Sequence, residues 1–157
     1  MTPRVDCSAA QRTQRPEIPA SEPAAGHAYV AGARRGVALL LWSADPAEPV
    51  RLSTPFFHAA AAAALEVQVE VYFSAASVQL LAPGVADRLH SGPSTDHSVA
   101  GAMRMAHQHG ARFFAWADAL KAQGLRREAL IDLCSGLGGS VQFMARTIDP
   151  AWRALVY

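Results

Sequence analysis

Cys134 is the residue best suited to covalent chemistry in this 157-residue chain. It stands just before a glycine-rich stretch, Ser135–Ser140, which we expect to turn into a helix. A thiol near a helix N-terminus has a lowered pKa and more thiolate character, which would suit a persulfide carrier. The alternative is a buried and inert thiol, because free cysteine usually behaves as a small hydrophobic residue.

The glycine-rich stretch itself is a candidate binding element. Backbone N–H groups of Gly136, Gly138, Gly139 and Ser140 can cradle an anion at the start of a helix, although a tight turn explains the same residues. The stretch is not a dinucleotide fingerprint, which would follow the first strand and have its third glycine where Val141 stands. It also lacks the Lys-Ser/Thr pair of a phosphate-binding loop, so we predict no cofactor.

Four further side chains follow expected strands and are candidates for a shared pocket. Trp42, Trp116 and Asp118 come at or after the ends of two strands, and His58 lies in the helix that follows the first strand. In an open parallel sheet, ligands bind beyond the carboxyl ends of the strands. We therefore predict a pocket that these residues share with Cys134 and the glycine-rich stretch. For His58, an alternative is a histidine that caps or packs its own helix.

Histidines at positions 97, 107 and 109 do not form a helical metal site. His107 and His109 are two residues apart, and His97 is ten residues from His107, so helical spacing separates their side chains. No HExxH or Cys-x-x-Cys pattern is present, and we predict no metal.

These candidates need an α/β scaffold to position them. Val37–Trp42 is a continuous apolar run typical of a strand buried on both faces, and Val67–Phe73 alternates like a strand with one drier face. The helix between them begins near Ser53 or Thr54 and Pro55, so the three elements form a βαβ unit with parallel strands. We expect further strands over Arg112–Trp116 and Arg153–Tyr157 and near Leu133–Cys134. We also expect further helices over Ala75–Leu81, His97–His109, Ala117–Gln123, Arg126–Leu133 and Val141–Ile148. Thr95 or Asp96 would cap the second of these helices. This order predicts a three-layer α/β/α sandwich with a mainly parallel sheet of four to five strands.

Composition defines the limits of the domain and excludes several function classes. Residues 1–34 are rich in Pro, Ala, Ser and Glu without hydrophobic periodicity, which predicts a disordered N-terminal tail before a domain over 35–157. The net charge of +1, from 14 basic and 13 acidic residues, does not favour nucleic-acid or membrane binding. Two cysteines, Cys7 and Cys134, indicate free thiols in a reducing compartment, and without a signal peptide we expect a cytoplasmic protein.

Three stretches resemble the DsrE/DsrF-like family, whose members include small sulfur-relay subunits. They are the opening strand with its alanine-rich helix, Gly110–Leu120, and Ser135–Gly138 followed by a helix and a short strand that ends in an aromatic residue. In sulfur-carrier members, a cysteine stands six residues past the glycine, where this chain has Trp116. Tryptophan cannot carry a persulfide, so the carrier role does not transfer to that position.

The resemblance implies a non-carrier oligomeric subunit or ligand-binding protein related to intracellular sulfur relay. It also implies a homo-oligomer (dimer, trimer or hexamer) and a sulfur-relay protein as partner. Two alternatives remain at this stage: a sulfurtransferase-type carrier that uses Cys134, and a regulator that binds a small molecule or nucleotide. The sequence leaves open whether the protein is an enzyme.

Overall fold

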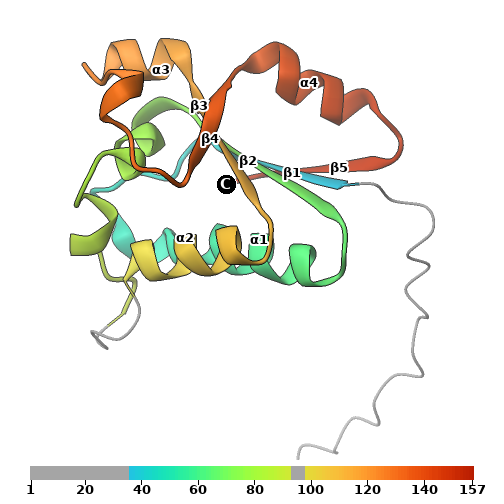
Figure 1. The fold of residues 1–157 in the computed structure, drawn as a ribbon, viewed down its shortest axis with the longest axis horizontal. Coiled ribbons are helices and arrows are strands. Elements are labelled where there is room, and N and C mark those ends of the chain that lie inside the picture. Colours follow the sequence, from blue (N-terminus) through green and yellow to red (C-terminus); the bar gives the residue numbers. More distant parts are fainter. Residues whose placement is uncertain (1–35, 93–97) are drawn as a thin grey trace, which may run out of the picture. The chain divides into compact units, whose positions relative to one another are not determined.

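Five parallel strands form a single sheet with helices on both faces. A computed structural model describes residues 36–92 and 98–157. The strands are β1 (Gly36–Leu41), β2 (Gln68–Phe73), β3 (Arg112–Trp116), β4 (Cys134–Gly138) and β5 (Trp152–Val156), in the spatial order β4-β3-β2-β1-β5. The helices are α1 (Ser53–Ala64), α2 (Val99–Gln108), α3 (Ala117–Ala122) and α4 (Ser140–Ile148). The predicted three-layer α/β/α class with a mainly parallel sheet is confirmed (Figure 1).

Some predictions fall outside the described residues. These are the disordered tail over residues 1–34, the state of Cys7, the caps at Thr95 or Asp96 and the position of His97. Among the described residues, the cap of α2 is Ser98, whose Oγ accepts a hydrogen bond from the Gly101 N–H at 3.1 Å. A serine at this position satisfies one of the helix's unpaired first-turn donors.

The start of α1 differs from the prediction in its capping. The helix begins at Ser53, and neither Ser53 nor Thr54 is its N-cap, which is Leu52 without a side-chain cap bond. The Ser53 hydroxyl is instead paired with the Ser91 hydroxyl. The side chain that was expected to cap the helix therefore hydrogen-bonds to a distant loop instead. Pro55 stands in the first turn of the helix, where its missing N–H removes no intrahelical hydrogen bond.

Two of the predicted helices are 3₁₀ rather than α, and the second is much shorter than predicted. Ala75–Leu81 is a 3₁₀ helix, and between Arg126 and Leu133 there is only a 3₁₀ turn, Arg127–Ala129; shorter 3₁₀ turns cover Pro49–Arg51 and Ala86–Arg88. Ser77 Oγ donates to the Leu41 and Ser74 carbonyl oxygens, which fixes the first of these segments against the end of β1. After the second 3₁₀ turn, the Ile131 N–H donates to the Leu81 carbonyl oxygen, and a turn at residues 132–133 leads into β4.

The glycine-rich stretch is also different from the expected turn. Residues 134–138 form strand β4, which is hydrogen-bonded to β3 with an irregular register between Phe113 and Phe114. Only Gly139 remains to connect β4 to α4. The strand has little apolar character because β4 lies at the edge of the sheet, where one side chain in two faces solvent.

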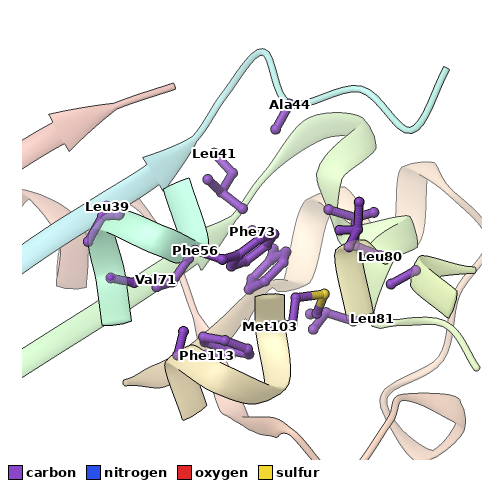
Figure 2. Packing of buried hydrophobic residues seen from close by; sticks show 14 of the residues in the cluster. Leu39, Leu41, Ala44, Phe56, Val71, Phe73, Leu80, Leu81, Met103 and Phe113 are labelled. Carbon is purple, nitrogen blue, oxygen red and sulfur yellow. The ribbon is translucent and has the colours of Figure 1, made fainter. Parts of the chain in front are cut away.

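The two faces of the sheet carry cores of different size. Leu39, Leu41, Val71, Phe73 and Phe113 point to the face that α1 and α2 cover, where Phe56 of α1 stacks between them (Figure 2). Alternate residues of the same strands, including Leu40 and Tyr72, point to the face under α4. This second core is much smaller, and α4 is the helix that Figure 1 shows above it. The strand predicted over Val67–Phe73 is present as β2, but its residues 69–73 are all buried, so the prediction that only one of its faces is dry is wrong.

Candidate functional site

A cavity of about 560 Å³ opens beyond the carboxyl ends of β3 and β4. Five residues predicted for the ligand pocket line it: Trp116, Asp118, Gly138, Gly139 and Ser140. The remaining lining residues come from the same two connections: Ala117, Leu137, Val141, Gln142 and Ala145. The cavity therefore lies where two neighbouring parallel strands each lead into a helix, which is the usual location of a ligand in an open α/β sheet.

Trp116 forms one wall of the cavity. It is the last residue of β3 and the N-cap of α3, and it packs against both cores. Its indole nitrogen Nε1 is buried and has no hydrogen-bond partner among the described residues. A buried donor without a partner costs about 1–3 kcal/mol.

The N-terminus of α4 forms the opposite wall. Gly139 is the N-cap, and no side chain within residues 36–92 and 98–157 caps the helix. The Phe143 N–H donates to the Gly139 carbonyl oxygen, which leaves the first-turn amides of residues 140–142 without intrahelical partners. These amides and the positive end of the helix dipole favour a negatively charged or strongly accepting group.

Gly138 brings the two walls close together. A Cβ atom at this position would lie 2.9 Å from Cβ of Phe114 and 3.3 Å from Cε1 of Tyr72. Real Cβ atoms essentially never approach that closely, so a side chain here would push β4 away from its neighbours. Gly136 and Gly139 have open space at the same position. Of the three glycines, Gly138 is thus the one that the packing requires.

Asp118 lies at the exposed rim. Its carboxylate is fully accessible and stands 3.9 Å from the Lys121 ammonium, an i,i+3 contact on α3. Such an exposed pair contributes little to stability. The carboxylate therefore remains available as an acceptor for a donor or cationic group of a ligand.

A buried ion cluster that the sequence analysis missed holds α4 on the sheet. Glu70 of β2 is fully buried, and both its oxygens accept from Arg146 of α4, with Nε to Oε2 at 2.8 Å and Nη2 to Oε1 at 2.9 Å. Arg112 Nη2 donates to Oε1 at 2.6 Å, and the Tyr72 hydroxyl donates to Oε2 at 2.6 Å. The Arg146 guanidinium also lies over the Trp152 ring, 4.2 Å from its centroid. A glutamate inside an otherwise apolar strand was the only sequence signal of this cluster.

The electrostatics of the cluster favour the charged glutamate. Burial acts to raise the pKa of Glu70, but the hydrogen bonds from Arg146 and Tyr72 and the charges of Arg146 and Arg112 outweigh it, so the pKa lies below its usual value of 4.5. Burial and the hydrogen bond to Glu70 raise the pKa of Tyr72 well above its ordinary range. Hydrogen bonding to Glu70 raises the pKa of Arg146, although desolvation opposes it. Glu70 is therefore a structural anion, and Tyr72 remains a donor.

Trp42 and His58 lie away from the cavity. Trp42 follows β1 and is 62% exposed, while His58 of α1 shares a hydrogen bond of 2.5 Å between its Nδ1 and the Tyr157 hydroxyl. Neither lines the cavity. Both belong to the β1–β5 end of the carboxyl edge, and β2 separates that end from β3 and β4. The structure therefore places these two residues in a second group at the same edge.

Cys134 and Gly136 also lie outside the cavity lining. Cys134 is the first residue of β4, so the whole strand separates its thiol from the N-terminus of α4. The side chain is half-buried against the larger core, and its Sγ lies 3.4 Å from the Gly136 carbonyl oxygen. This environment resembles a packed thiol more than a helix-activated one.

Within residues 36–92 and 98–157, no helix is long and apolar enough to cross a membrane. Over the same residues, no group of three or more His, Cys, Asp or Glu side chains is arranged to hold a metal ion.

The fold is that of DsrE/DsrF-like proteins, as the resemblance predicted. The chain superimposes on the YchN protein of E. coli with a TM-score of 0.61 and 13% identity, over 79% of this chain and 99% of that one. It superimposes on MTH1491 of Methanobacterium thermoautotrophicum, a protein of unknown function, with a TM-score of 0.54 and 20% identity over the same shares. No family model matches the sequence, and no curated protein matches it.

Proposed function

We propose that this protein is a ligand-binding, non-carrier relative of the small sulfur-relay subunits, acting in the cytoplasm as a homo-oligomer beside a sulfur-relay partner. The observation that carries the proposal is the cavity between Trp116 and the N-terminus of α4. Trp116 occupies the position where carriers of the resembled family have cysteine, so a wall of a binding site replaces a sulfur-bearing side chain. The site then acts through reversible binding.

The polar groups around the cavity define the ligand chemistry. One wall offers the uncapped amides at the start of α4, which are donors, and another is formed by Trp116. Asp118 at the rim is an acceptor. The proposed ligand is therefore a small molecule with an anionic or strongly accepting group for the amides of α4 and a donor group for Asp118. Oxoanions of sulfur or phosphorus, free or as part of a nucleotide, meet the first requirement.

A thermal-shift screen tests this proposal directly. The full-length protein is heated with phosphate, sulfate, sulfite, thiosulfate and a panel of nucleotides, because specific binding to the folded state raises the melting temperature. We expect at least one of these compounds to raise it in a saturable manner. A flat response across the whole panel would count against an anion-binding cavity.

The Trp116→Phe variant tests whether the ligand binds in the cavity or elsewhere on the surface. It replaces the indole with a smaller aromatic ring and so reshapes this wall of the cavity, and we expect the affinity for a hit to fall by roughly tenfold. The free protein should keep its stability, because the lost donor had no partner. Trp42→Phe is the matched control, since Trp42 is exposed and outside the cavity. Equal affinities in the two variants, measured by isothermal titration calorimetry, would contradict the proposed site.

The alternative of a persulfide carrier at Cys134 has its own test. The protein is incubated with a persulfide donor, and peptide mass mapping locates any added sulfur, with Cys7→Ser as a control for the other thiol. A non-carrier gains no sulfur at Cys134. A stable added sulfur there would move the chemistry to the start of β4 and replace the present proposal.

A further inference from the structure

A second cavity opens at the side of the larger core and has a volume of about 160 Å³. Three segments that are far apart in the sequence meet around it: residues 80–87, helix α2, and residues 131–133 before β4. The hydrogen bond from the Ile131 N–H to the Leu81 carbonyl oxygen joins the first and the last of these segments. The cavity shares no lining residue with the one at Trp116, so the proposed function neither uses it nor depends on it.

The interior of this second cavity is apolar. Leu80 and Met103 are fully buried, and Ala86 and Ala100 beside them are buried as well. A water molecule inside a protein needs roughly two to four polar partners, which these side chains do not offer. An apolar cavity of about 150 Å³ takes a benzene-sized group instead. The interior is therefore suited to one aliphatic or aromatic group, and the flexible Met103 side chain can adapt to its shape.

Two opposite charges stand at the mouth of the cavity. Asp87 and Arg104 belong to the lining, but their side chains are 56% and 52% exposed. Arg104 Nη1 donates to Asp87 Oδ1 at 3.2 Å, and neither side chain has another hydrogen bond within residues 36–92 and 98–157. An exposed ion pair of this kind contributes little to stability. A ligand can therefore share or replace it at small cost.

We propose that this cavity binds a free α-amino acid with an apolar side chain. The side chain of the ligand fills the apolar interior, while its carboxylate accepts hydrogen bonds from the planar guanidinium of Arg104. The ammonium of the ligand donates to the Asp87 carboxylate. A free amino acid has its two charges on neighbouring atoms of one carbon, and Asp87 and Arg104 present the two opposite charges within hydrogen-bond distance of each other. A ligand with a single charge would match only one of them.

The size of the interior selects among amino acids. The phenylalanine side chain is a benzene ring on one methylene group, and the leucine and methionine side chains are of similar size, so these three fit the space. Alanine would leave most of the interior empty. Serine and lysine would bring a polar group into an apolar space without a partner, which is unfavourable. We therefore expect binding of leucine, methionine or phenylalanine and not of serine or lysine.

Isothermal titration calorimetry of the full-length protein with these five amino acids tests the proposal. Two leucine analogues then separate the charges of the ligand: leucinamide lacks the carboxylate, and 4-methylpentanoate lacks the ammonium. Each analogue should bind at least about tenfold more weakly than L-leucine, because it loses a charge-assisted hydrogen bond. Absence of binding for all three apolar amino acids, or analogues that bind as well as L-leucine, would overturn the proposal.

Two variants test the interior and the mouth separately. Ala100→Leu fills the interior and should abolish binding, with thermal unfolding as the check that it is folded. Arg104→Gln changes an exposed side chain, so it tests the site even where Ala100→Leu is unfolded, and it should weaken binding at least about tenfold. Arg51→Gln is the matched control, since Arg51 is an exposed partner of Glu48 outside this cavity. Equal affinities in the two arginine variants would refute the assignment of Arg104.

The methyl group of Met103 reports where the ligand binds. In protein with ¹³C-labelled methionine methyl groups, L-leucine should shift the NMR signal of Met103 in a saturable manner. Met105 of the same helix is exposed and outside the lining, so its signal should stay in place. A shift confined to Met105, or to Met144 of α4, would place the ligand elsewhere and end the proposal. A flat response in the anion screen described above would count against the Trp116 cavity alone and leave these results unaffected.

Discussion

The two faces of the sheet are built in different ways. The face under α1 and α2 is filled with aliphatic and aromatic side chains that leave a continuous apolar core. The face under α4 has a small apolar cluster beside a buried ion cluster, and next to these lies the cavity. The difference arises because α1, α2 and α3 all contribute side chains to the first core, whereas α4 is the helix that contributes to the second.

This contrast indicates that the two faces of the sheet have different roles in the domain. On the face that α1 and α2 cover, hydrophobic burial is enough to hold the helices on the strands, although it has no preferred direction. A lone helix has less apolar area to bury, and directional ion pairs and hydrogen bonds fix its position instead. The incompletely covered face is also the one that keeps room for a ligand. Substitutions on each face test whether the two faces have these separate roles.

The largest effect is expected in the apolar core. Phe56 is fully buried, with ring centroids 6.0 Å from Phe73 and 5.9 Å from Phe113. Phe56→Ala should therefore lower the free energy of unfolding by about 3–5 kcal/mol, measured by urea denaturation. Its neighbour Phe57 is exposed, so Phe57→Ala should cost much less. Equal losses in the two variants would show that this face is not packed as described.

A smaller effect is expected from the ion cluster under α4. Arg146→Met removes two of the hydrogen bonds to Glu70 and leaves the buried carboxylate with Arg112 and Tyr72. Removal of one partner from a fully buried pair costs about 3–5 kcal/mol, but Arg146 is partly exposed and Arg112 remains, so we expect about 2 kcal/mol in urea denaturation. Arg153→Met is the control, since its hydrogen bonds go to backbone carbonyls beside it. A neutral Arg146→Met variant would mean that α4 is held by Phe143 and Trp152 alone.

The same cluster predicts a pH dependence. The folded-state pKa of Glu70 lies below 4.5, so its contribution to stability is complete above that pH and is lost as the pH falls through the folded-state pKa. Glu70→Gln should be less stable than the wild type near neutral pH, and the difference should shrink in acid. Urea midpoints across this pH range provide the measurement. A difference between the two proteins that stays constant with pH would contradict the depressed pKa.

The smallest effect is expected at the glycine that shapes the cavity. Gly138→Ala places a Cβ against Phe114 and should cost about 1–2 kcal/mol while it disturbs the cavity wall. Gly136→Ala, in the same strand but with open space around it, should stay within about 0.5 kcal/mol of the wild type. Thermal unfolding compares the two variants. The packing assignment fails if Gly136→Ala is the more damaging substitution.

Much of the layout follows from local patterns in the sequence. The apolar run at β1, the alternation in β2 and the helix between them gave the parallel sheet. The rule that ligands bind at the carboxyl edge brought Trp116, Asp118 and Gly138 into one predicted pocket, and all three line one cavity.

Features that depend on tertiary context could not be predicted. A strand was expected only near Leu133–Cys134, because the glycines that follow show no alternation, whereas β4 extends to Gly138 because its backbone pairs with β3. Trp42 and His58 were assigned to the pocket because strand order was unknown, and the order β4-β3-β2-β1-β5 puts them at the other end of the edge. The Glu70–Arg146 pair joins residues 76 positions apart, a separation that no local pattern encodes.

The strand order has a consequence for how the chain folds during its synthesis. β1 pairs with β2 on one side and with β5 on the other, and Gly36 stands opposite Trp152 in that second pairing. Of the described strands, β1 therefore leaves the ribosome first and must wait for the last to cover its outer edge. Until then a row of unpaired amides beside apolar side chains is open to other chains. The β1–β5 pairing is accordingly the step at which we expect chaperone capture and aggregation to compete with folding.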